Sequence, residues 1–142
     1  MGKNKHLIYL GLSLLSGLLL SIAWQPVYIL PAIFVAFVPL LLMEKRIREE
    51  QRNARFWVLL YGWICFLSWN VATVWWIWNA SAGGALAAFV INSLPMVLPL
   101  FLYHVRAEKT GKAHLLYFIA LWLSIEMLQF HWDFAFPWLV LG

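Results

Sequence analysis

Residues 56–78 read FWVLLYGWICFLSWNVATVWWIW, a run without a single charged side chain. A helix needs about 20 apolar residues to cross the ~30 Å hydrocarbon core of a bilayer, so this run is long enough to span one. Lipid offers no hydrogen-bonding partner to an open backbone, and a helix satisfies its own peptide groups. The run therefore predicts a transmembrane helix.

Four further apolar stretches flank this run, at residues 7–24, 27–43, 85–105 and 113–130. Of all residues 64% are hydrophobic and only 11% are charged, whereas roughly 25% are charged in an ordinary soluble domain. The sequence thus predicts an all-α membrane protein. We expect a bundle of about five transmembrane helices that forms one domain over residues 1–142.

The ten lysines and arginines fall in three clusters, and alternating spans would leave all three on the same side of the membrane. The clusters are Lys3 and Lys5; Lys45, Arg46, Arg48, Arg52 and Arg55 in the charged connector 44–55; and Arg106, Lys109 and Lys112. Cationic loops stay preferentially in the cytoplasm, so we expect the N-terminus inside and the C-terminus outside. The same pattern accounts for the net charge of +4 without a nucleic-acid partner.

The first apolar stretch has two interpretations. Lys3 and Lys5 precede it, and small residues at positions 21–23 would suit cleavage of a signal peptide. Alternatively, Ser13, Gly17 and Ser21 form a stripe of small residues that is typical of helices packed closely inside a membrane. The stripe favours a retained helix.

Polar residues inside the predicted spans are few. Glu126 is the one acid, and a carboxylate in the membrane needs a partner or a function. Glu126 could orient a polar substrate or headgroup, or it could accept a hydrogen bond from Trp122 one helical turn away. Asn70 and Asn92 are expected to form hydrogen bonds between helices.

No catalytic motif is found. The histidines lack the spacing at which a helix holds a metal ion, and His6, His104 and His114 are expected to be wet side chains at the membrane surface. Cys65 lies within an apolar run without a neighbouring base that would hold it as a thiolate. We therefore expect no catalytic residue, no metal and no cofactor in this chain.

Aromatic residues gather in two segments that the charge pattern assigns to the outer face. One holds Trp75, Trp76 and Trp78, and the other is the tail with Phe136, Pro137 and Trp138. Such rings commonly anchor a protein at the membrane surface, but this density could also line an entry for acyl chains.

With these segments in view, the chain resembles the amino-terminal membrane part of the apolipoprotein N-acyltransferases. The resemblance rests on the order and spacing of AWQP at 23–26, FVPLL at 37–41, WWI at 75–77, WLSIE at 122–126 and FPWL at 136–139. It implies a bacterial inner-membrane enzyme that moves an acyl chain from a phospholipid to the N-terminal diacylglyceryl-cysteine of a lipoprotein. It also implies that a cysteine, a glutamate and a lysine on a nitrilase-like domain outside the membrane perform the transfer.

The resemblance therefore gives this chain a supporting role. We expect a truncated form that anchors the enzyme, is inactive alone, and contributes a lipid-facing floor made by Trp75, Trp76, Trp78, Glu126 and the tail residues Phe136, Pro137 and Trp138. The alternative is a non-enzymatic membrane module, such as a small transporter subunit or an assembly partner. A transporter should carry polar groups near the midplane, where this sequence has few.

Overall fold

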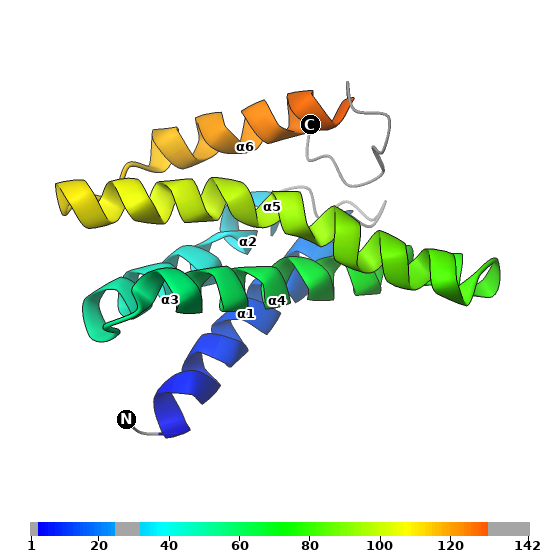
Figure 1. The fold of residues 1–142 in the computed structure, drawn as a ribbon, viewed down its shortest axis with the longest axis horizontal. Helices are drawn as coiled ribbons and strands as arrows, with labels where there is room; N and C mark the ends of the chain where they lie inside the picture. Colours follow the sequence, from blue (N-terminus) through cyan, green and yellow to red (C-terminus); the bar gives the residue numbers. More distant parts are fainter. Residues whose placement is uncertain (1–2, 25–31, 131–142) are drawn as a thin grey trace.

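The computed structural model describes residues 3–24 and 32–130, and these residues form helices and short connections (Figure 1). In chain order the elements are α1 (Lys3–Trp24), α2 (Ala32–Ala36), α3 (Val38–Glu50), α4 (Ala54–Val74), the 3₁₀ helix η1 (Trp75–Asn79), α5 (Ala82–Thr110) and α6 (Leu115–Phe130). Neither described range contains a strand.

Three segments are long and apolar enough to cross a membrane: Asn4–Trp24, Ala54–Asn79 and Ala82–Thr110. The fourth apolar helix, α6, has 16 residues and is shorter than a full span. Most exposed large side chains are aliphatic or aromatic, which suits contact with lipid tails. The predicted fold class, an all-α membrane bundle, is confirmed.

The second apolar stretch is not one straight helix in its described part. It contains the short α2, a turn at Phe37, and then α3, which has Pro39 in its first turn. Proline is favoured there because the first turn of a helix has no partner for its N–H groups. Helix α3 then continues to Glu50, so the predicted charged connector at 44–55 is largely helical.

Helices α1 and α4 pack closely at Gly17. A Cβ atom at this position would lie 2.6 Å from the carbonyl oxygen of Cys65 and would also collide with the Ser68 hydroxyl. Ser13 and Ser21 on the same stripe are buried as well. Gly17 of the small-residue stripe predicted in the first stretch therefore lies in a close contact between helices.

Helix α5 packs along α4, and polar side chains join the two helices inside the bundle. The Asn92 side-chain amide donates to the side-chain Oδ1 atom of Asn70 at 2.7 Å, and the Trp63 indole donates to the Ser93 hydroxyl at 2.9 Å. These contacts confirm the predicted hydrogen bonds between helices. Helix α5 runs unbroken through its internal prolines and bends near its middle (Figure 1).

Three ion pairs gather at one end of the bundle, where α3 and α5 end and α4 begins. Lys5 pairs with Glu50 at 2.8 Å and Arg55 with Glu108 at 2.9 Å, while Arg48 binds Glu44. The hydrogen bond from Lys5 lowers the pKa of Glu50 below its usual value. We refer to this end as the basic end.

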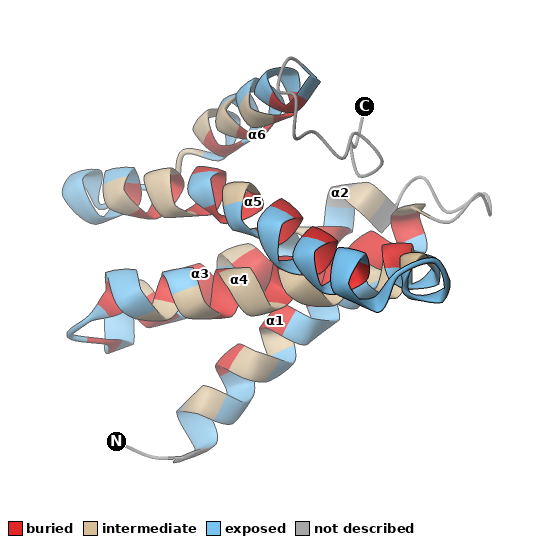
Figure 2. Cartoon of the chain, turned by 45° about the vertical axis from the view of Figure 1, so that its right-hand side comes forward, coloured by how far each residue is buried: buried red, intermediate tan, exposed pale blue. Residues whose placement is uncertain are grey.

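Helix α6 is less enclosed than α3, α4 and α5. It packs on α5, while its outer side leaves Leu116, Met127 and Leu128 more than three-fifths exposed (Figure 2). Buried residues concentrate instead where α1, α3, α4 and α5 face one another. The centre of the core therefore lies around α4.

Candidate functional site

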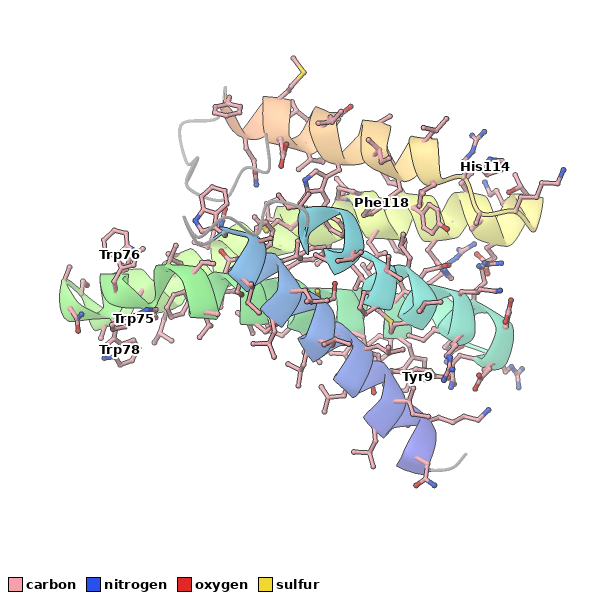
Figure 3. All side chains as sticks on the ribbon, turned by 180° about the vertical axis from the view of Figure 1, so that it is seen from behind. Tyr9, Trp75, Trp76, Trp78, His114 and Phe118 are labelled. Atoms are coloured by element: carbon pink, nitrogen blue, oxygen red, sulfur yellow. The ribbon has the colours of Figure 1, made fainter. Side chains whose placement is uncertain are left out.

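The three predicted tryptophans lie together at the tip of the bundle opposite the basic end. Trp75, Trp76 and Trp78 belong to η1, and each side chain is about half exposed. Figure 3 shows them projecting from this tip, far from His114 at the other end. Successive residues of a 3₁₀ helix are about 120° apart, so Trp75 and Trp78 share one face of η1 and Trp76 lies on another. The predicted site residues Phe136, Pro137 and Trp138 lie outside the described residues.

Glu126 is buried on α6, with a side chain held from within the same helix. The Trp122 indole nitrogen donates to its Oε1 atom at 2.8 Å, and only 7% of Glu126 is exposed. This hydrogen bond is one of the two roles that the sequence allowed for Glu126. The bond fixes one carboxylate oxygen, and Glu126 makes a further interaction beyond it.

Trp122 is also the centre of an aromatic cluster that joins α6 to the bundle. Its ring lies 4.8 Å from Phe37, 5.4 Å from Phe66 and 6.3 Å from Trp69, measured between ring centroids. Phe118, one turn earlier on α6, packs against Phe37 at 5.3 Å. Pairs at these distances attract beyond simple burial, so the cluster gives the Glu126 carboxylate a rigid support.

A second buried acid lies near the basic end and was not predicted. The His104 Nδ1 atom is 2.7 Å from the Glu44 Oε1 atom, which also accepts a hydrogen bond from Arg48 at 3.0 Å. Both Glu44 and His104 have no exposed side-chain surface. The expectation that His104 is wet is therefore wrong: α3 and α5 enclose it, and a carboxylate replaces water as its partner.

Helical spacing could have placed both residues in the core. Glu44 lies four residues after Leu40 and three before Ile47, and both of these are fully buried. His104 follows buried Leu100 by the same interval. Residues three or four apart share a helix face, so each polar side chain had to point inward. Glu44 was missed because residues 44–55 were assigned to a connector between spans.

Few side chains among the described residues could take part in covalent chemistry. Cys65 is fully buried where α4 meets α1, so a substrate cannot reach its sulfur without opening the bundle. No group of three or more His, Cys, Asp or Glu side chains that could hold a metal ion occurs within residues 3–24 and 32–130. The arrangement is suited to holding helices and contacting lipid.

Comparison with known families agrees with this membrane arrangement. Residues 16–142 match the family model of the apolipoprotein N-acyltransferase N-terminal domain. The chain belongs to the apolipoprotein N-acyltransferase family. The resemblance noted in the sequence is thereby confirmed.

Two relatives in this family are much longer than this chain. The apolipoprotein N-acyltransferase of Chlorobaculum tepidum is 31% identical over 135 residues, which cover 92% of this chain and 24% of the relative. That of Haemophilus influenzae is 28% identical over 147 aligned positions, covering 98% and 27% respectively. The chain thus spans about a quarter of the length of these relatives. No solved structure matches it.

Proposed function

We propose that this chain forms the membrane-embedded part of an apolipoprotein N-acyltransferase in the bacterial cytoplasmic membrane. The enzyme would transfer an acyl chain from a phospholipid to the N-terminal diacylglyceryl-cysteine of a lipoprotein. The observation that carries this proposal is the family match over residues 16–142, a range that includes the C-terminal part of α1 and every later helix.

The chain's share of this activity is anchoring and lipid contact. Within the described residues the cysteine is sealed in the bundle, so the nucleophile of a transfer through a thioester must come from another part of the enzyme. The chain alone is expected to be inactive. It needs no metal or cofactor for this role.

We assign the lipid-facing floor to the tip that carries Trp75, Trp76 and Trp78, together with Phe136, Pro137 and Trp138 further along the chain. Half-exposed indole rings favour the headgroup region, where one edge is apolar and the N–H meets water. Glu126, fixed by Trp122, would orient a polar headgroup beside this floor.

A transporter subunit is less well supported. Transport sites usually present polar groups toward a path near the bilayer midplane. Here the Asn92 amide is bonded to Asn70, whose own amide is bonded to the Phe66 carbonyl oxygen at 2.8 Å. These groups satisfy each other within the packed interface of α4 and α5.

A chimera tests the proposal. The chain replaces the aligned quarter of the Haemophilus influenzae relative, and the chimera is expressed in cells depleted of their own N-acyltransferase. We expect growth and N-acylated lipoprotein, identified by mass spectrometry of the lipoprotein's N-terminal peptide. A chimera that accumulates in the membrane at the parent level but yields no N-acylated product would refute the proposal.

A matched pair of variants tests the floor within that chimera. Trp78→Ala removes a half-exposed ring at the tip and is expected to lower the N-acylated fraction. Phe56→Ala removes a similarly exposed ring near the basic end and should leave this fraction unchanged. Equal effects of the two variants would contradict the assigned floor.

A further inference from the structure

An apolar groove of about 360 Å³ separates α6 from α2 and α3. Val38 and Leu41 form one wall, and Leu115, Phe118 and Ile119 form the other. Val38, Leu115 and Ile119 are each about half exposed, so the groove can be reached from the side. Figure 3 shows Phe118 projecting from α6 toward the body of the bundle.

One end of this groove is basic. Lys45 lies four residues after Leu41 and therefore on the same face of α3, one turn beyond the groove wall. On the opposite wall, Lys112 and His114 immediately precede Leu115. Helix α3 runs toward the basic end and α6 starts from it (Figure 1). The positions of Lys45 after Leu41 and of Lys112 before Leu115 therefore place both residues toward the same end of the groove.

No ion pair in the described part of the chain neutralises the positive charges of these two lysines. Both are exposed, and neither forms an ion pair within the described part of the chain. The nearby acids Glu44, Glu50 and Glu108 are already bound to Arg48, Lys5 and Arg55, respectively. Glu49, one turn after Lys45, is exposed and also forms no ion pair. The groove end thus carries excess positive charge.

We propose that an anionic glycerophospholipid binds here, with one acyl chain in the groove and its phosphate between Lys45 and Lys112. An acyl chain gains little by leaving neighbouring lipid for an apolar groove, because both surroundings are apolar. A preference of the site for one lipid over another must therefore come from the headgroup. Each lysine near an anionic headgroup strengthens lipid binding about five-fold. Charge complementarity thus selects an anionic lipid over a neutral one.

This site is independent of the proposed acyl transfer. The proposed headgroup position lies at the basic end, whereas the tryptophan floor occupies the opposite tip (Figure 3), and the groove extends from the basic end as far as Trp122 and Leu123. Loss of lipid binding at the groove would leave the family assignment and the chimera result intact.

Native mass spectrometry of the purified chain in detergent tests the site. The probes are dioleoyl phosphatidylglycerol and dioleoyl phosphatidylcholine, which share acyl chains but differ in net charge. We expect the chain to retain the anionic lipid preferentially. Lys45→Gln and Lys112→Gln should each weaken its binding about five-fold and leave the neutral lipid unaffected. Equal retention of the two lipids by the unmodified chain would overturn the proposal.

Two further variants locate the lipid. Arg52→Gln removes an exposed charge at the same end but outside the groove, and it should not change binding. Ile119→Trp fills the groove from an accessible position and should weaken retention of the anionic lipid. If Arg52→Gln weakens binding of the anionic lipid as much as the lysine variants do, the lipid responds to the total positive charge of this end and not to the two lysines at the groove. If Ile119→Trp has no effect, or the chain pairs with a second copy through this groove, the lipid is not bound there. Each of these results would refute the proposal.

Discussion

At the scale of single residues, Glu44 and His104 are two titratable side chains that are fully buried against each other. The Oε1 atom of Glu44 lies within hydrogen-bond distance of both His104 and Arg48. The Oε2 atom of Glu44 and the Nε2 atom of His104 have no hydrogen-bond partner among the described residues. Burying charge is costly unless it is paired, so each member depends on the others. The group stabilises the bundle only while it is complete.

A double-mutant cycle tests this dependence. Glu44→Leu leaves His104 and Arg48 without their carboxylate, and we expect it to lower the free energy of unfolding by about 3–5 kcal/mol. Adding His104→Leu should recover part of that loss, because an apolar pair no longer contains an unpaired polar group. Unfolding by SDS in mixed micelles measures both values, with Glu49→Leu on the exposed side of α3 as the control. Additive losses would show that the two residues are not coupled.

Gly17 gives a second prediction for a single residue. Gly17→Ala places a methyl group against the backbone of Cys65, so α1 must move away from α4. We expect a loss of about 1–3 kcal/mol in the free energy of unfolding. Gly11→Ala in the same helix is the matched control, because nothing lies within 4 Å of its added Cβ atom. Equal stability of the two variants would show that the close contact is absent.

At the scale of secondary structure, α6 is attached by fewer contacts than the central helices. It packs on α5 and reaches the rest of the bundle through Trp122 and Phe118. Helices in lipid gain stability from close packing and not from escaping water, so the few rings that interlock decide its position.

Phe118→Ala should therefore release α6. Phe118 is 3% exposed and contacts Phe37 and Tyr103, so its removal leaves a gap that costs about 3–5 kcal/mol. We expect faster proteolysis near residues 111–114 while the remaining helices stay protected. Phe130→Ala, at an exposed site on the same helix, serves as the control. Unchanged proteolysis of the Phe118 variant would contradict this attachment.

At the scale of the whole molecule, the distribution of charge leads to a prediction of orientation. The ion pairs collect at one end and the three tryptophans of η1 at the other. In a Cys65→Ala background, Glu49→Cys should react with a thiol reagent only from the cytoplasmic side. Ala80→Cys, in the turn between η1 and α5, should react only from the outside. Labelling of both positions from one side would refute the expected topology.

The sequence alone supported the helical fold because membrane insertion leaves little choice. Apolar runs of sufficient length must be helical in lipid, and the stripe of small residues around Gly17 indicated a close contact between helices. The bond from Trp122 to Glu126 was also foreseeable, because residues four apart meet on one helix face. Each of these inferences uses spacing within a single helix.

Only the tertiary structure decided which helices meet and which polar groups pair across them. Glu44 and His104 are sixty positions apart, and their contact follows from how α3 and α5 cross. The groove beside α6 arises in the same way, from side chains of separate helices that fail to fill the space between them. Spacing within one helix fixes its faces, but only packing fixes what each face touches.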